Sequence, residues 1–282
     1  MPRDFRMSDL PRISIVTPSY NQGAFIEQTI QSVLDQGYPD LEYIVIDGGS
    51  NDNSVDIIRK YSDALTSWVS EPDRGQSHAI NKGFAQASGD IFGWLNSDDR
   101  LEPGCLEVVA DAFMRNPETG VFVGHGRKID TAGETVYYKK PDELTFERLC
   151  GWMNGGNFMQ PSCFFRRSAW ESAGPLDEDI HIAMDVDLWL RMIKKVEFRP
   201  IDRLLSSAVA HEAAKTTADI NRMVVDCSLV VARAGGDRYV RERLESLADQ
   251  LTRCEDRYQK LVQHPLVRFM KPLLRRIYKL TA

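Results

Sequence analysis

The stretch ISIVTPSYN, residues 13–21, decides the fold. Its first four residues are mainly apolar and β-branched, which predicts a strand, and polar side chains follow directly. Similar apolar runs predict further strands at 43–46, 65–69 and 91–95. Segments with a helical spacing of apolar residues separate these runs, at 25–34, 54–61 and 76–87, and from Cys105 onward. Apolar strands alternating with helices indicate an α/β domain with a doubly wound, mostly parallel sheet covered on both faces.

The second half of the chain is less regular, and its last part is helical. A hairpin is expected where residues 121–129 are followed by the turn Asp130–Gly133 and by a second apolar run at 134–138. Further strands are expected at 162–165 and 197–206, and a helix at 186–193. From about Ile220 the sequence shows helical periodicity alone, which predicts a helical C-terminal extension.

Composition and charge exclude several classes of protein. The chain has 282 residues, of which 43% are hydrophobic and 27% charged, and these values exclude a wholly disordered protein. Its net charge of −6 argues against a nucleic-acid partner. The segment from Arg257 to the end holds seven basic residues and no acidic one, which leaves −13 for the rest of the chain. The protein is therefore expected to have an acidic body and a basic tail.

The cysteines and the length of the apolar segments predict a cytoplasmic protein. The five cysteines lie far apart, and no pair has the spacing of metal ligands or of a disulfide framework. The first residues lack the apolar stretch of a signal peptide, and no segment approaches the roughly 18 apolar residues that span a bilayer. We therefore expect any membrane contact to be peripheral, on the inner face of the cell membrane.

Polar residues follow each of the four expected N-terminal strands, at the edge where doubly wound domains bind ligands. The sequence has neither the G-x-G-x-x-G pattern of dinucleotide-binding proteins nor a P-loop, which disfavours both classes. Asp98 and Asp99 are adjacent acids at a strand end, and such carboxylates suit a Mg²⁺ or Mn²⁺ ion that also contacts a diphosphate. Tyr20 offers a stacking face for a base, and Asp47 an acceptor for a base N–H or a ribose hydroxyl.

The order of these motifs resembles glycosyltransferase family 2. The similar segments lie between about residues 12 and 215: TPSYN (17–21), VIDGGSND (45–52), EPDRG (71–75), NKG (81–83), GWLNSDD (93–99), QPSCFFR (160–166) and AMDVDLWLR (183–191). The resemblance implies a GT-A fold and an inverting sugar transfer from a nucleotide-diphosphate sugar, with Mn²⁺ or Mg²⁺ as cofactor. It divides the chain into a GT-A catalytic domain at 1–218, with a donor half at about 12–100 and an acceptor half at about 101–218, and an extension at 219–282.

The resemblance also assigns roles to single residues on the donor side. Thr17, Pro18, Tyr20 and Asn21 are expected to line the nucleoside pocket, with Asp47 reading the base. Arg74 is expected near donor phosphate or ribose. The D-x-D metal motif of the family corresponds to Asn96, Ser97 and Asp98, so its first acid is absent here.

Metal and proton-transfer roles follow in the same way. Asp98 keeps the position most often bound to metal, Asp99 follows it, and His211 resembles a histidine that many members place near metal or diphosphate. The catalytic base of the family lies in a Glu-Asp pair that corresponds to Met184 and Asp185, so Asp185 is the expected base. Two ordinary roles stay open: Asp185 could cap a helix beginning near Val186, and His211 could be a structural histidine.

Three functions remain possible on this sequence. A glycosyltransferase acting on a glycan or lipid-linked acceptor of the cell envelope or an exopolysaccharide is the main hypothesis. The replacement of family acids by Asn96 and Met184 keeps a catalytically inactive nucleotide-sugar-binding protein open. A nucleotidyltransferase would share the crevice, but no Gly-rich basic loop follows the first strand.

The C-terminal extension suggests two partners. Its apolar residues recur with alternating spacings of four and three, a heptad seam that predicts a homodimer; the alternative is a helix lying on its own catalytic domain. The seam residues are Val240, Leu244, Leu247, Leu251, Cys254, Tyr258 and Leu261. The last residues combine an apolar helical face with cationic side chains, which predicts contact with an anionic membrane surface; the alternative is packing on the acidic body.

Overall fold

The protein forms two compact units, residues 1–235 and 236–282, in a computed structural model. The structure describes residues 10–130, 132–141, 143–210, 220–267 and 270. His211 and most of the basic tail fall outside these ranges, so the expectations for them are not addressed by the structure. Each unit is described by itself.

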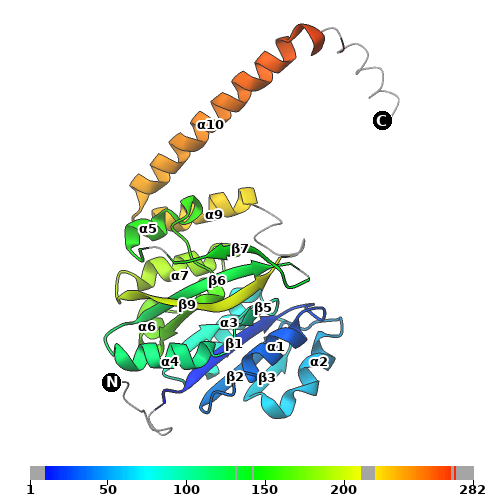
Figure 1. The fold of residues 1–282 in the computed structure, drawn as a ribbon, viewed down its shortest axis with the longest axis vertical. Coiled ribbons are helices and arrows are strands. Elements are labelled where there is room, and N and C mark those ends of the chain that lie inside the picture. The colour runs from blue at the N-terminus through cyan, green and yellow to red at the C-terminus, as the bar shows by residue number, and fades with distance from the viewer. Residues whose placement is uncertain (1–9, 131, 142, 211–219, 268–269, 271–282) are drawn as a thin grey trace. The chain divides into compact units, whose positions relative to one another are not determined.

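The N-terminal half of the first unit is a parallel βα arrangement, as expected (Figure 1). Its strands are ordered β3-β2-β1-β4 and are all parallel to their neighbours. They are β1 (Ile13–Ser19), β2 (Leu41–Asp47), β3 (Ser67–Ser70) and β4 (Ile91–Trp94), connected by α1 (Ile26–Leu34), α2 (Ser54–Lys60) with the short η2 (Ser62–Ala64), and α3 (Gln76–Gln86). The register places Ser19, Asp47 and Ser70 side by side, so the first three strands end at one edge.

The C-terminal half of the same sheet is largely antiparallel and continues the order as β4-β8-β6-β9-β5, with β7 beside β6. Only β6 and β9 run parallel there. The elements are β5 (Asp99–Leu101), α4 (Cys105–Arg115), β6 (Val121–Ile129), β7 (Thr135–Lys139), α5 (Phe146–Cys150), η3 (Trp152–Asn154), η4 (Gln160–Ser162), β8 (Cys163–Arg166), α6 (Arg167–Ala173), α7 (Met184–Met192) and β9 (Phe198–Val209). The expected hairpin is β6 and β7, whereas β5 escaped the sequence analysis because it has only three residues.

Each face of the sheet carries its own apolar layer. On one face, Ile26, Ile30 and Val33 of α1 pack with residues of α4 and with alternate strand residues such as Ile13 and Ile15. This is the face turned to the viewer in Figure 1, where α1 and α4 lie in front of the sheet. Because successive strand residues point to opposite faces, the residues between them supply the second layer.

An aromatic cluster forms the second layer and joins the two halves of the sheet. The indoles of Trp94, at the end of β4, and Trp189, in α7, are stacked with centroids 5.3 Å apart. Phe165 of β8 contacts both at 6.3 and 5.8 Å. Phe84 of α3, Phe92, Phe158 and Trp170 complete the cluster. Aromatic side chains bury large areas, so this cluster fixes α3 and α7 against β4 and β8.

The first unit includes the helix that the sequence assigned to the extension. In α9 (Ile220–Arg233) the side chains of Cys227, Val230 and Val231 are buried, and the helix contacts α7 and η3. Lys194 donates to the carbonyl of Ala234 at the end of this segment. The compact unit therefore ends at residue 235 rather than at the expected boundary after residue 218.

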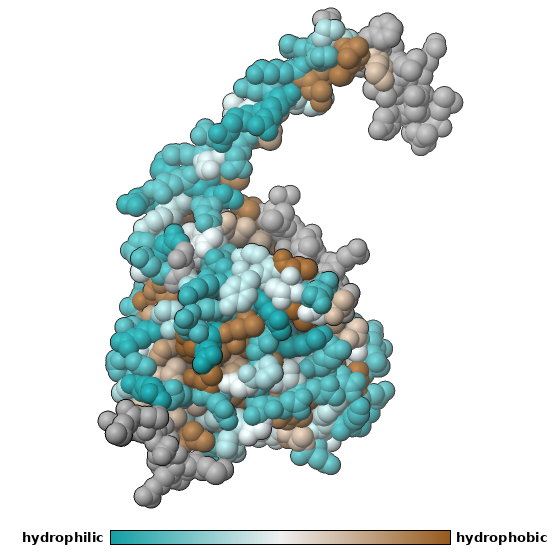
Figure 2. Space-filling view, in the orientation of Figure 1, coloured by the Kyte–Doolittle hydropathy of each residue, from teal (hydrophilic) through white to brown (hydrophobic). Residues whose placement is uncertain are grey.

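The second unit is dominated by α10 (Asp237–Gln263), none of whose residues is buried. Its surface is mainly hydrophilic, with apolar side chains along its length (Figure 2). Leu244, Leu251, Tyr258 and Leu261 of the expected seam are exposed. Within the described ranges, no helix combines the length and apolarity that crossing a bilayer requires.

The aromatic cluster yields a stability prediction. Replacing the buried Trp189 by alanine should lower the free energy of unfolding by about 3–5 kcal/mol, because the cavity next to Trp94 and Phe165 cannot be refilled. The matched control is Leu229→Ala in α9, whose side chain is 63% exposed and should change stability by less than about 0.5 kcal/mol. Urea unfolding followed by far-UV circular dichroism measures both. Equal effects of the two substitutions would contradict the assigned role of the cluster.

Candidate active site

The loops that follow β1 and β2 are held together by hydrogen bonds. Asn21 lies in the left-handed region, with φ of 52°, which asparagine tolerates better than most residues. Its backbone N–H donates to Ser50 Oγ at 2.7 Å, and its side-chain oxygen accepts from the N–H of Asn51 at 3.0 Å. The N–H of Gly23 donates to Asp52 at 2.9 Å. These hydrogen bonds thus fix the two loops relative to each other beyond the ends of β1 and β2.

The residues expected to line the nucleoside pocket differ in solvent exposure. Tyr20 is 59% exposed at the end of β1, so its ring is free to receive a flat ligand. Thr17 and Pro18 are buried inside β1, and the Thr17 hydroxyl is 3.1 Å from the hydroxyl of Tyr43. Of the four residues expected to line a nucleoside pocket, Tyr20 and Asn21 are therefore exposed, whereas Thr17 and Pro18 are covered by protein.

Asp47 is fully buried at the end of β2, and its carboxylate orders the loop that follows. It accepts the backbone N–H groups of Gly49 and Ser50 at 3.1 and 2.9 Å. The hydroxyls of Ser50 and Ser70 donate to it at 2.5 and 2.7 Å. In this conformation its acceptor positions are occupied by the protein, so a ligand N–H would replace one of these donors.

Asn96 is the hydrogen-bonding centre of the turn after β4. Its side-chain oxygen accepts from Gln76 of α3 at 2.7 Å, and its amide donates to Asp99 at 3.0 Å. Gln160 of η4 also accepts from this amide, at 3.3 Å, and donates to the carbonyl of Trp94 at 3.0 Å. Neither glutamine was expected at the site. An asparagine here links three segments that are distant in sequence.

Asp98 and Asp99 form a close pair of acids in this turn. Asp99 is buried, and this burial together with the charge of Asp98 raises its pKa well above the usual value for aspartate. Lys128 of β6 acts in the opposite direction. The turn is supported from α1, where Thr29 donates its hydroxyl to the carbonyls of Ser97 and Asp99 at 2.9 and 2.8 Å.

The chemistry of this acid pair fits a hard divalent cation. Two adjacent carboxylates supply the oxygen ligands that Mg²⁺ and Mn²⁺ prefer, and the mutual repulsion seen in the pKa of Asp99 is what a cation relieves. In the ranges that the structure describes, no three His, Cys, Asp or Glu side chains gather as a preformed metal centre. His211, the expected third ligand, lies outside those ranges.

Asp185 lies in the first turn of α7, with its side chain partly buried. The helix begins at Met184, so Asp185 is inside the helix and is not its N-terminal cap; its oxygen accepts from the N–H of Val186 at 2.8 Å. Burial raises the pKa of Asp185 to about 6. Burial and the nearby Asp185 also raise the pKa of Cys227, in α9, to about 12.

Two consecutive residues of α3 connect the turn after β4 with the start of α7. Gln76 bonds to Asn96, as described above, and the hydroxyl of Ser77 donates to the sulfur of Met184 at 2.8 Å. Both positions where family acids were expected, 96 and 184, are therefore engaged by α3. This bridge connects the turn that carries Asp98 and Asp99 with the first turn of α7, which carries Asp185.

Arg74 is placed beside this bridge but bonds to protein. Its guanidinium donates to Glu178 at 2.9 and 2.5 Å, and the carboxylate also accepts from Asn81 at 3.3 Å. Together with residues 75–77 and His181, this pair lines a small open hollow of about 50 Å³. Glu178 was not singled out from the sequence, because a glutamate in a loop carries no pattern of its own.

The parallel half of the sheet, the acid pair and the partly buried aspartate in α7 together define a GT-A glycosyltransferase. Residues 14–173 match the family described as Glycosyl transferase family 2, and the chain belongs to this family. An uncharacterized glycosyltransferase of Rickettsia typhi is 27% identical over 224 residues, covering 76% of this chain and 68% of the relative.

Other relatives are polysaccharide synthases that are much longer than this chain. Hyaluronan synthase of Pasteurella multocida is 27% identical over 212 residues, covering 74% of this chain but 21% of the relative. Chondroitin synthase of Escherichia coli is 27% identical over 210 residues, covering 72% of this chain and 29% of that protein. The chain therefore spans a quarter or so of these synthases.

Solved structures confirm the GT-A fold. S. aureus TarS, residues 1–349 in complex with UDP, has a TM-score of 0.61 at 19% identity, covering 83% of this chain and 70% of that one. The mannosyltransferase PcManGT from Pyrobaculum calidifontis, in complex with GDP-Man and Mn²⁺, has a TM-score of 0.61 at 16% identity and covers 95% of this chain and 86% of that one.

The raised pKa of Asp185 predicts a pH-dependent effect on stability. Because the folded pKa of about 6 exceeds the unfolded value of 3.8, the stability contributed by this group is present below pH 4 and lost as the pH rises through 6. Asp185→Asn, which has the same shape, should therefore raise the free energy of unfolding by up to about 3 kcal/mol at pH 8 and leave it unchanged at pH 4.

Urea unfolding at both pH values measures this difference. Asp179→Asn removes an exposed carboxylate from the segment before α7 and serves as the control for a changed net charge. A stabilisation by Asp185→Asn that is equal at the two pH values would contradict the raised pKa.

Proposed function

We propose that this glycosyltransferase moves a sugar from a nucleotide-diphosphate sugar to an acceptor hydroxyl with inversion of configuration. Asp185 accepts the proton of the hydroxyl as its oxygen forms a bond to the anomeric carbon. The bond from that carbon to the diphosphate breaks on the opposite face, and the nucleoside diphosphate leaves. The observation that carries the proposal is a partly buried aspartate, with a pKa of about 6, that α3 connects to the acid pair of the turn after β4. A base with a pKa near the working pH is effective in proton transfer.

The donor is proposed to bind across the ends of β1, β2 and β4. Tyr20 and Asn21 offer the exposed surface for the nucleoside, above Thr17 and Pro18, and Asp47 receives a base N–H in exchange for one of its present donors. Arg74 can reach the donor phosphates or ribose if its bond to Glu178 opens. Solved neighbours in complex with UDP, UDP-GlcNAc and GDP-Man support a donor of this class.

We further propose that Asp98 and Asp99 hold Mn²⁺ or Mg²⁺, with His211 as the additional ligand expected from the sequence. When bound, the ion supplies positive charge that offsets the charge developing on the leaving diphosphate. Asn96 and Ser97 position the two acids: Asn96 through its bond to Asp99, and Ser97 through the carbonyl that Thr29 holds. The Mn²⁺ ion in the complex of the Pyrobaculum calidifontis mannosyltransferase supports a metal of this kind.

The acceptor is proposed to be a glycan or a lipid-linked sugar used in the synthesis of a cell-envelope or extracellular polysaccharide. The polysaccharide synthases among the relatives support this class of acceptor. All five cysteines, each in a described segment, are free thiols, which supports a location on the cytoplasmic side. Homodimer formation through α10 stays a prediction.

The catalytic role of Asp185 predicts a specific loss of turnover. Asp185→Asn should lower kcat by about 10²- to 10⁴-fold, and donor affinity should stay within about twofold, because the base acts only on the acceptor. In the native protein kcat should fall about tenfold per pH unit below pH 6, as Asp185 becomes protonated.

The assay screens UDP-, GDP- and dTDP-sugars with Mn²⁺ and measures released nucleoside diphosphate, while proton NMR of the product reports its anomeric configuration. Asp187→Asn is a poor control because Asp187 pairs with Arg191 at 2.8 Å, so the exposed Asp179→Asn is used instead. Release of pyrophosphate would indicate a nucleotidyltransferase, and donor binding without release would indicate an inactive binding protein.

A lipid-linked acceptor gives the basic C-terminal tail a purpose at the membrane surface. We predict that the full chain co-sediments with vesicles that contain anionic phospholipid and that a truncation after Gln263 does not, because the truncation removes the cationic residues from Arg268 onward. Neutral vesicles serve as the control. Equal pelleting of both proteins on anionic vesicles would contradict a role of the tail.

A further inference from the structure

A row of side chains crosses β5, β9, β6 and β7 on one face of the sheet. Asp99 of β5 pairs with Ala208 of β9, Ala208 pairs with Lys128 of β6, and Lys128 pairs with Tyr137 of β7. Paired residues of neighbouring strands place their side chains on the same face. These four residues, here called the Lys128 row, therefore begin at the acid pair and lead away from it.

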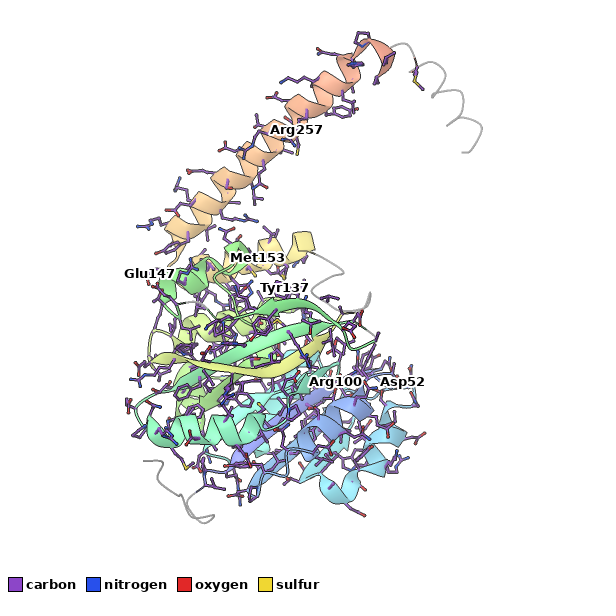
Figure 3. All side chains as sticks on the ribbon, in the orientation of Figure 1. Asp52, Arg100, Tyr137, Glu147, Met153 and Arg257 are labelled. Carbon is purple, nitrogen blue, oxygen red and sulfur yellow. The ribbon has the colours of Figure 1, made fainter. Side chains whose placement is uncertain are left out.

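The Lys128 row lies on the face of the sheet that packs against η4. Gly126 lies two residues before Lys128 and therefore on the same face of β6. It pairs with Ser206, and a side chain at Gly126 would meet Met159. The hydroxyl of Ser206 lies 2.5 Å from that of Ser162 in η4. The row thus lies on the side of the sheet that carries η4. In Figure 3, Tyr137 lies on the side of β7 that is turned toward η3, where Met153 is labelled.

The middle and far end of the Lys128 row are accessible to a ligand. Tyr137 is 47% exposed, and Lys128 is partly exposed. Within the described residues the ammonium of Lys128 makes no hydrogen bond or ion pair, whereas neighbouring cations are engaged: Arg127 with Glu102, Lys139 with the carbonyl of Gly155 and Lys140 with Asp202. Ala208 adds only a methyl group between Lys128 and Asp99, so little side-chain bulk separates them.

Strand spacing sets the length of the Lys128 row. Neighbouring strands lie about 4.8 Å apart, which places the Lys128 backbone about 10 Å from Asp99 and Tyr137 about 5 Å farther. A sugar lying against Tyr137 is therefore about 15 Å from Asp99, which is two to three sugar rings along a bound acceptor chain from the proposed metal position.

The side chains of the row define the chemistry of the ligand. An exposed aromatic ring offers a flat apolar surface for the C–H face of a sugar ring, and a lysine ammonium beside it binds a carboxylate or a phosphate. We propose that Lys128 and Tyr137 bind the acceptor and that the acceptor sugar over Tyr137 carries an anionic group. This inference rests on the proposed glycosyltransferase function and adds the charge of its acceptor.

The test compares three methyl glycosides that differ at one position, with Mg²⁺ present: methyl glucoside, methyl glucuronide and methyl glucoside 6-phosphate. Saturation-transfer NMR titration of the full chain measures each affinity. The native protein should bind the glucuronide or the phosphate about five- to tenfold more tightly than the neutral glucoside, since a charge-assisted hydrogen bond to Lys128 is added. The preferred anion distinguishes a carboxylate from a phosphate.

The variants separate the two side chains. Lys128→Gln should abolish the preference for the anionic probe, Lys128→Arg should retain it, and Tyr137→Ala should weaken all three probes about equally. Lys140→Gln removes a lysine at the end of the same hairpin that is already paired with Asp202, and it should change nothing. Circular dichroism spectra verify that each variant is folded.

Three results would overturn the inference. The first is equal affinity of the native chain for all three probes. The second is a preference for the anionic probes that survives in Lys128→Gln. The third is a loss of nucleoside-diphosphate affinity in Lys128→Gln while the preference for the anionic probes is retained. The last result would assign Lys128 to the donor. A thermal-shift measurement with UDP and GDP is made in parallel, because a chain that binds neither contradicts the proposed function itself. A chain that binds one of them but shows no anionic preference contradicts only this inference.

Discussion

The stacking of Trp94 on Trp189 is the contact on which the geometry of the site depends. Trp94 ends the strand that leads into the turn with the acid pair, and Trp189 lies on the helix whose first turn carries Asp185. These elements come from different halves of the chain, and the polar contacts between them pass through side chains of α3. Indoles packed at 5.3 Å in a buried layer permit little sliding, so the separation between the acid pair and Asp185 is set by apolar packing.

The two halves of the sheet contribute different kinds of surface to the candidate site. Its parallel half brings strand ends to one edge, where short loops can bind the donor, as doubly wound folds do. Its antiparallel half extends the sheet beyond β4 and adds the hairpin β6–β7, which exposes aromatic and cationic side chains. The proposed acceptor side is therefore built from strand faces, whereas the proposed donor side is built from loops.

The sequence predicted the parallel half well because its strands are apolar throughout and its helices keep a regular spacing. Three-residue β5 and the short α5 and α6 were missed, since a few residues cannot establish a period. At the site, Asp98 and Asp185 stand in motifs and could be named in advance. Gln76, Gln160 and Glu178 could not, because an amide or carboxylate acquires its role only when the fold brings its partner near. The burial of Thr17 and the saturation of Asp47 are likewise properties of packing, which no pattern of residue types encodes.

The hydrogen bonds that Gln76 and Ser77 of α3 make to Asn96 and Met184 have an electrostatic consequence. Both residues occupy positions where acids were expected, and both keep a hydrogen-bonding partner that an acid would also accept. Neither position therefore carries a negative charge, whereas an acid at each would add two. The proposed donor, a nucleotide-diphosphate sugar, is itself an anion, so the work of bringing it from water to this edge of an acidic protein is reduced, and less cationic charge is needed to hold it there.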